Sequence, residues 1–145
     1  MLTLYCAAAY DGSYALPTAV AGTLAGGKFT PTAERGRTRV MTARTAKELR
    51  EYLSAVITEG TGKAAAPKTV SAAGKTATAQ TGRYENGKEI CEGWFCGFFP
   101  AEEPQYTVIV FSENTEKQTK SCAEIFAAIA DRAQPFRSCT HVKSD

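Results

Sequence analysis

Residues 69–100 read TVSAAGKTATAQTGRYENGKEICEGWFCGFFP, and this stretch decides the fold. Its first part, from Thr69 to Gly82, mixes β-branched and small residues without a helical period, which is typical of a strand. Asn86-Gly87 is a strong hairpin signal, because both residues tolerate the positive φ angles of a tight turn. The segment ICEGWFCGFF at 90–99 is then the returning strand. The sequence therefore predicts an antiparallel hairpin here.

The residues after this hairpin add a third strand and a closing helix. Pro100 to Pro104 are predicted to form a turn. YTVIVF at 106–111 is apolar on both faces, as a central strand would be. From 119 to 134, apolar residues recur at helical spacing, which predicts a helix that can cover one face of the sheet. Its apolar face comprises Cys122, Ile125, Phe126, Ile129 and Ala133.

The residues before the hairpin predict two further helices. Residues 2–10 are apolar and alanine-rich, which indicates a buried helix. Residues 11–31 carry several glycines and prolines and are predicted to be loops with one short extended piece. Thr45 and Glu48 have the spacing of a capping box, which predicts a helix that begins there with Thr45 as its N-cap and Glu48 at the third helical position. TEGTGKAAAPK at 58–68 is predicted to be a flexible connector. The fold class is α+β: an antiparallel three-strand meander flanked by helices.

Composition excludes several classes of protein. A chain of 145 residues with a net charge of +2 is one domain by length and offers no electrostatic case for nucleic acid. No apolar run approaches the roughly 18 residues of a membrane-spanning helix, so no membrane segment is expected. The five cysteines and His141 are poorly spaced for zinc, and the cysteines are interpreted as small core residues. No metal and no cofactor are expected.

Lys75-Thr76-Ala77-Thr78 is the candidate functional motif. It is not a phosphate-binding loop, because Thr69 stands where that loop needs its first glycine. On these residues alone, a lysine on a solvated edge strand, where it discourages aggregation, is a better explanation than a site. Small neighbours such as Ala77 would also let a substrate backbone lie close against the strand.

The residues around the motif resemble a known family. AAGKTATAQTG, CEGWFCGFFP and YTVIVF, in this order, are similar to the C-terminal part of a penicillin-binding protein transpeptidase domain, the serine D,D-acyltransferase family. That family carries S-x-x-K, S-x-N and K-T-G in chain order, and Lys75-Thr76-Ala77 aligns with the third element. RVMTARTAKELREYLSAVITEGTGKAA at 39–65 and LTLYCAAAYDG at 2–12 resemble the segments that precede it.

The resemblance implies roles for four residues. Lys75 would supply positive charge and relay protons, and the hydroxyls of Thr76 and Thr78 would bind the terminal carboxylate of a D-Ala-D-Ala stem peptide. The backbone N–H of Thr78 would be an oxyanion-hole donor. The substrate would lie antiparallel along the strand, and β-lactams would imitate it. Ala77 replaces the family's usual glycine, and its methyl group could narrow the site.

Two of the family's motifs are missing. None of the serines is followed by a lysine at the third place; they are Ser13, Ser54, Ser71, Ser112, Ser121, Ser138 and Ser144. Ser112-Glu113-Asn114 has the S-x-N spacing but follows the lysine motif, and Tyr84-Glu85-Asn86 ends in the predicted turn; both are interpreted as structural. The expectation is a single partial domain over residues 1–145, inactive alone. Lacking the two strands that the resemblance places beside 106–111, it would expose a strand edge and self-associate.

Three functions stay open at this point. The first is a piece of a peptidoglycan D,D-transpeptidase, whose parent protein would act on the extracytoplasmic face of the bacterial cell membrane. The second is a β-lactam sensor or serine β-lactamase relative. The third is a non-catalytic module that binds D-Ala-D-Ala peptides.

Overall fold

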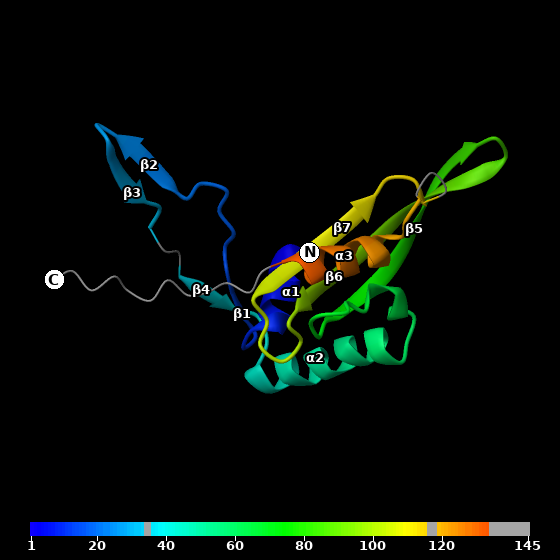
Figure 1. The fold of residues 1–145 in the computed structure, drawn as a ribbon, viewed down its shortest axis with the longest axis horizontal. Coiled ribbons are helices and arrows are strands. Elements are labelled where there is room, and N and C mark those ends of the chain that lie inside the picture. The colour runs from blue at the N-terminus through cyan, green and yellow to red at the C-terminus, as the bar shows by residue number, and fades with distance from the viewer. Residues whose placement is uncertain (34–35, 116–118, 134–145) are drawn as a thin grey trace.

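A computed structural model describes residues 1–33, 36–115 and 119–133 (Figure 1). The elements, in chain order, are α1 (Leu2–Ala9), β1 (Ser13–Ala15), β2 (Gly22–Ala25), β3 (Lys28–Pro31), β4 (Arg37–Arg39), α2 (Ala43–Thr58), the 3-10 turn η1 (Lys63–Ala65), β5 (Ala73–Glu85), β6 (Lys88–Phe99), β7 (Tyr106–Ser112) and α3 (Cys122–Arg132).

The main sheet has the strand order β5-β6-β7, and both pairings are antiparallel. The predicted meander is therefore confirmed. Asn86 and Gly87 form its first turn with φ angles of 53° and 78°, which a hairpin turn of two residues requires. The β5–β6 hairpin extends beyond the helices at one end of the sheet (Figure 1). β7, which was expected to resemble a central strand, is an edge strand among the described residues.

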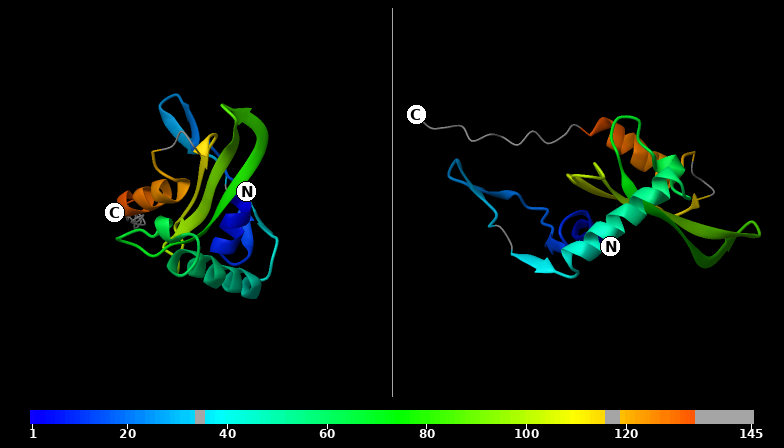
Figure 2. Two further views of the ribbon diagram at one scale, coloured as in Figure 1. Left: turned by 90° about the vertical axis from the view of Figure 1, so that its right-hand side faces the viewer. Right: turned by 90° about the horizontal axis from the view of Figure 1, so that it is seen from below.

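Helices cover both faces of this sheet (Figure 2). On one face, α3 buries Phe126 against Phe95, with ring centroids 4.6 Å apart, and the cluster continues to Phe99 and Val110. On the other face, α1 and α2 pack against Phe98 and Ala73; the cluster there consists of Ala9, Leu53, Ala73 and Phe98. Because strand side chains alternate between faces, neighbouring residues of β6 serve the two cores in turn. The sheet is therefore the middle layer of the fold.

Side chains fix where the two longer helices begin. The prediction that α2 begins at Thr45 was wrong: the helix starts at Ala43, and Thr42 is its N-cap. The Thr42 hydroxyl accepts a hydrogen bond from the Thr45 backbone N–H at 3.0 Å. A capping box does occur at α3, where Ser121 and Glu124 satisfy each other's backbone N–H groups. The predicted α3 was slightly too long at its start.

The segment 11–31, predicted to be loops with one short extended piece, contains three short strands, β1, β2 and β3. β2 pairs with β3, and β1 pairs with β4, which lies beyond that segment; both pairings are antiparallel. The β2–β3 hairpin turns at Gly26-Gly27, where φ is 56° and 77°. It projects away from the three-stranded sheet (Figure 1). Its cross-strand pair Leu24 and Phe29 remains 73% and 56% exposed. This hairpin therefore adds little to the core.

The remaining sequence expectations concern cysteines, metals and membranes. Cys96 and Cys122 are buried, and Cys6 and Cys91 are half-buried; none of these four forms a disulfide. Cys139 and His141 lie outside the described residues. In the described part of the chain, no three His, Cys, Asp or Glu side chains gather as metal ligands. The helices of that part are all too short or too polar to cross a bilayer.

Candidate functional site

The Lys75-Thr76-Ala77-Thr78 motif lies near the start of β5, which forms the outer edge of the sheet. Thr76 is paired with Phe95 across the hairpin, so its side chain lies on the α3 face. Lys75 and Ala77 therefore project from the opposite face. No other strand of the described residues pairs with the outer edge of β5. The motif thus borders an open sheet edge.

Alternate residues of the motif turn their backbone groups toward this open edge. A Cβ atom placed at Gly74 would lie 2.7 Å from the carbonyl oxygen of Cys96, so this carbonyl points from β6 toward β5. Cys96 is the cross-strand partner of Lys75, whose backbone therefore pairs with β6. Alternate residues of an antiparallel strand direct their N–H and C=O groups to opposite edges. Thr76 and Thr78 consequently present their backbone groups outward.

The Lys75 ammonium group folds back over the strand edge. Its Nζ donates a hydrogen bond to the Thr76 carbonyl oxygen at 2.8 Å and lies 3.4 Å from Thr76 Oγ1. The hydroxyl of Thr61, from the segment that follows α2, lies 3.4 Å from the same Thr76 Oγ1. The edge therefore gathers one ammonium group and two hydroxyl groups. Such a set binds anionic or carbonyl oxygens.

A hollow of about 240 Å³ lies beside the motif, between the strands and the start of α3. Thr76 and Thr78 line it from β5, and Ser121 and Cys122 line it from the helix. The hollow therefore lies between the side chains of Thr76 and Thr78 and the first residues of α3. Space for a ligand is thus present next to Thr76 and Thr78.

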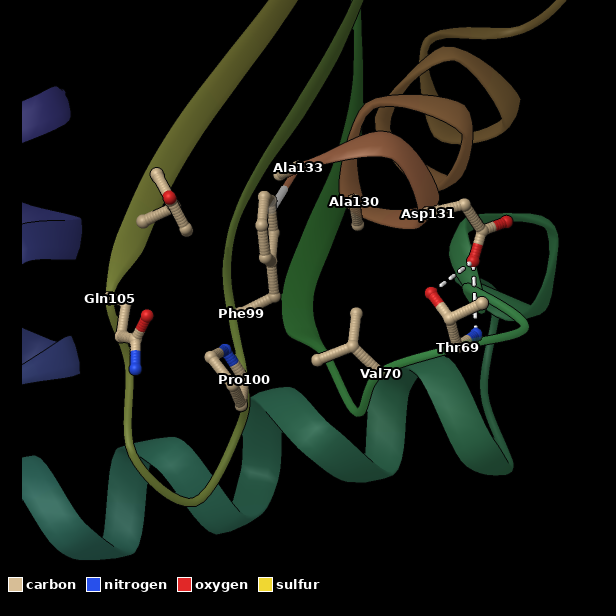
Figure 3. Close-up of a pocket in the computed structure, with 9 residues that line it drawn as sticks. Thr69, Val70, Phe99, Pro100, Gln105, Ala130, Asp131 and Ala133 are labelled. Atoms are coloured by element: carbon tan, nitrogen blue, oxygen red, sulfur yellow. Dashed lines mark hydrogen bonds between the residues drawn. The ribbon is translucent and has the colours of Figure 1, made fainter. Parts of the chain in front are cut away.

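The loop that leads into β5 is fixed by a carboxylate clamp (Figure 3). Asp131 Oδ1 accepts hydrogen bonds from the backbone N–H groups of Lys68 at 2.6 Å and Thr69 at 3.0 Å, and from the Thr69 hydroxyl at 3.1 Å. Desolvation alone would raise the pKa of Asp131, but these hydrogen bonds outweigh it and hold the pKa below its ordinary value of 3.8.

The clamp borders a second hollow, of about 350 Å³. Val70, Phe99, Pro100 and Ala130 make most of its wall apolar (Figure 3). Apart from the clamp and Gln105, few polar groups converge on it. We regard this hollow as part of the packing around the loop before β5, because its polar edge is already occupied by the clamp.

The two segments that resemble the S-x-N motif, Ser112-Glu113-Asn114 and Tyr84-Glu85-Asn86, lie away from the lysine motif. Ser112 ends β7, on the far side of β6 from β5. Tyr84 to Asn86 form the tip of the β5–β6 hairpin. Both segments lie where the sequence predicts them, one at a strand end and one in the turn. Thr61 carries no signal in the sequence, because only the fold brings it next to Thr76.

Comparison with known proteins agrees with this geometry. Residues 1–131 match the family described as the penicillin binding protein transpeptidase domain. The stage V sporulation protein D of Bacillus subtilis (strain 168) is 37% identical over 79 residues, which make up 52% of this chain and 12% of that protein.

Solved structures are similar over most of the chain. The D,D-transpeptidase domain of a peptidoglycan glycosyltransferase from Eggerthella lenta matches with a TM-score of 0.73 and 29% identity, over 88% of this chain and 30% of that one. Penicillin-binding protein A from M. tuberculosis, solved as an imipenem acyl-enzyme complex, matches with a TM-score of 0.71 and 25% identity, over 88% of this chain and 28% of that one. The chain thus spans under a third of the length of these relatives.

The family match extends over nearly the whole chain and includes the three-stranded sheet, its helices and the Lys75-Thr76-Ala77 strand. This chain belongs to the penicillin binding protein transpeptidase domain family.

Proposed function

We propose that this chain forms the substrate-binding edge of a serine D,D-transpeptidase, in a protein that cross-links peptidoglycan stem peptides and binds penicillin. One observation carries the proposal: Thr76 and Thr78 turn their backbone groups toward an open strand edge, directly beside the Lys75 ammonium group. An extended peptide can add to such an edge through main-chain hydrogen bonds. The parent protein would act on the extracytoplasmic face of the bacterial cell membrane.

Each group of the motif would contact a different part of the substrate, and these contacts define its proposed role. A D-Ala-D-Ala peptide would lie antiparallel to β5, with its terminal carboxylate near Lys75 and the hydroxyls of Thr76 and Thr78. The outward N–H of Thr78 would stabilise the negative charge that develops on the scissile carbonyl oxygen, a contribution of about 3–4 kcal/mol in acyl-transfer enzymes. Ala77 would bring its methyl group close to the acyl donor.

Residues 1–145 would form one partial domain, its C-terminal part, and the nucleophile would come from a segment with an S-x-x-K motif. There, a serine oxygen would bond to the carbonyl carbon while the terminal D-alanine leaves as an amine, and a second amine would then displace the serine. Because no serine of this chain has that motif, the chain alone would be inactive.

We also propose that the chain self-associates through β7. This strand is the second open edge of the sheet among the described residues, and it carries Phe111 with 46% of its surface exposed. An unpaired apolar edge is a template for another strand.

Two measurements test the proposal. Intact-mass spectrometry after incubation with excess penicillin should detect no covalent adduct, whereas a stoichiometric adduct would show that a serine of this chain is a competent nucleophile. Amide NMR spectra should shift at residues 75–80 when N-acetyl-D-alanyl-D-alanine is added. Shifts confined to other elements would contradict the assignment of β5 as the binding edge. Thr76→Val and Thr78→Val should each weaken the binding.

A further inference from the structure

The segment between α2 and β5 holds a residue that bears on the motif although it is fifteen residues away in sequence. Thr61 Oγ1 lies 3.4 Å from Thr76 Oγ1, and Lys75 Nζ lies 3.4 Å from the same oxygen. The Thr76 hydroxyl therefore has a second hydroxyl and an ammonium group as polar neighbours. The 3.4 Å separation is longer than the roughly 2.8 Å usual between hydroxyls, so a small side-chain rotation would complete the bond.

The segment that carries Thr61 is held firmly in place. The backbone N–H of Gly60 donates to the Ala55 carbonyl at 3.0 Å, and that of Gly62 donates to the Val56 carbonyl at 2.9 Å. A Cβ atom at either glycine would lie 3.0 Å from the Val56 carbonyl oxygen. The glycines are thus needed for close packing on the last turn of α2. This packing directs Thr61 toward β5, which a flexible connector would not do.

The hydroxyl chemistry indicates what Thr61 could contribute. A threonine hydroxyl has one proton to donate and can accept other hydrogen bonds. A carboxylate only accepts, so Thr76 binds it best when its own proton points outward. If the Thr61 hydroxyl donates to Thr76 Oγ1, the Thr76 proton is left for the ligand. The Lys75 ammonium group has three protons to donate. It bonds to the Thr76 carbonyl oxygen and to Thr76 Oγ1, and the second bond favours the same outward orientation of the Thr76 proton.

We propose that Thr61 is a positioning residue for carboxylate recognition: its hydroxyl orients the Thr76 hydroxyl toward the terminal carboxylate of the substrate. This inference rests on the proposed function, since it assumes that the peptide carboxylate lies beside Thr76. Thr61 acts through Thr76 and takes no part in bond making or breaking.

The test compares two ligands on the full chain by NMR titration: N-acetyl-D-alanyl-D-alanine and the same peptide with a C-terminal carboxamide. Thr61→Val removes the hydroxyl and keeps the side-chain shape, and Thr61→Ser restores the hydroxyl. Thr58→Val is the matched control, because the Thr58 hydroxyl bonds only to the Ser54 carbonyl of its own helix among the contacts described. Each variant is first checked for an unchanged amide spectrum away from residues 58–78.

The expected result is a change in ligand preference. Thr61→Val should lower the preference for carboxylate over carboxamide by about 3–10-fold, the equivalent of one hydrogen bond. Thr61→Ser should recover it, and Thr58→Val should leave it as in the unmodified chain. A general disturbance of the loop would weaken both ligands equally and leave their ratio unchanged.

The outcomes separate the two levels of the proposal. If the unmodified chain prefers the carboxylate, Thr76→Val abolishes this preference and Thr61→Val retains it, the role of Thr61 is refuted and the proposed function stands. If the unmodified chain shows no preference, or Thr76→Val retains it, the carboxylate does not lie at Thr76. That result refutes both the role of Thr61 and this part of the proposed function.

Discussion

Gly74, immediately before the lysine motif, offers a sharp test of how β5 is seated. A Cβ atom there would lie 2.7 Å from the Cys96 carbonyl oxygen and 2.7 Å from two atoms of the Phe95 ring. Phe95 is fully buried and packs on Phe126, so its ring has little room to move. Gly74→Ala must therefore push β5 away from β6 or displace a core aromatic ring.

The cost can be worked out from these contacts. Overpacking by one methyl group costs about 1–3 kcal/mol. Replacing glycine by alanine restricts the unfolded chain, which returns about 0.4–1 kcal/mol. We expect Gly74→Ala to lower the free energy of unfolding by about 1–2 kcal/mol. With a urea m-value of about 1–3 kcal/mol per molar, the midpoint should fall by about 1 M.

The assay is urea unfolding at one fixed protein concentration, followed by the fluorescence of Trp94, the chain's single tryptophan. Gly36→Ala is the matched control, since a Cβ atom at Gly36 meets no atom within 4 Å. It should change the free energy of unfolding by less than about 0.5 kcal/mol.

Phe95→Leu provides the decisive background. It removes the ring that obstructs the new methyl group, so the cost of Gly74→Ala should be smaller in this variant than in the unmodified chain. Two results would refute the reasoning. One is a Gly74→Ala midpoint equal to that of the unmodified chain, and the other is an undiminished cost of Gly74→Ala in the Phe95→Leu background.

Three further results are expected. Phe126→Ala should lower the free energy of unfolding by about 3–5 kcal/mol in the same urea assay, because a fully buried ring leaves a cavity; a loss below about 1 kcal/mol would contradict the packing of α3. Because the pKa of Asp131 is lowered in the folded chain, its carboxylate stabilises the fold above the ordinary pKa of 3.8, and this stabilisation is lost as pH falls through the lowered pKa. Asp131→Asn should therefore be less stable than the unmodified chain near about pH 6, and the difference in free energy of unfolding should shrink below about pH 4. A difference that does not change with pH would exclude the clamp. Phe111→Lys, which puts a charge on β7, should reduce self-association in sedimentation velocity, and a monomer at every concentration of the unmodified chain would count against the proposed β7 contact.

Short-range chemistry made the central sheet predictable. Asn86-Gly87 marks a turn that few other residue pairs can form, and the strands on either side have clear composition. The apolar spacing around Phe126 similarly identified α3. These signals are local, so they can be read without knowledge of the fold.

The errors arise where residues can serve two purposes. Thr42 and Thr45 are both suitable caps, and Glu48 favoured the wrong one because it stands at capping-box spacing after Thr45. In the structure the Glu48 carboxylate accepts a hydrogen bond from Arg44 Nε at 2.9 Å instead. Gly60 and Gly62 lie in the segment 58–68, which was predicted to be a flexible connector, yet a Cβ atom at either glycine would lie 3.0 Å from the Val56 carbonyl oxygen of α2. Whether a glycine provides freedom or close packing depends on its neighbours in space, which the sequence does not display.

The candidate site likewise contains residues that could be predicted from the sequence and residues that could not. The lysine motif could be found from residue order, and its position on an exposed edge follows from the meander. The neighbourhood of Thr61 could not be found in this way, because it depends on how the end of α2 packs. A contact between a motif and another segment, such as that of Thr61 with Thr76, becomes visible only when the fold is known.

The projecting β2–β3 hairpin should unfold locally in solution, independently of the rest of the protein. A two-stranded ribbon without a core of its own is marginally stable in water. Its amide hydrogens should exchange with solvent through local opening, at a free-energy cost far below that of unfolding the three-stranded sheet. Hydrogen exchange would therefore show two separate opening free energies, a low one for this hairpin and a high one for the three-stranded sheet. Slower amide exchange at Leu24 and Phe29 would indicate that another surface covers this exposed pair.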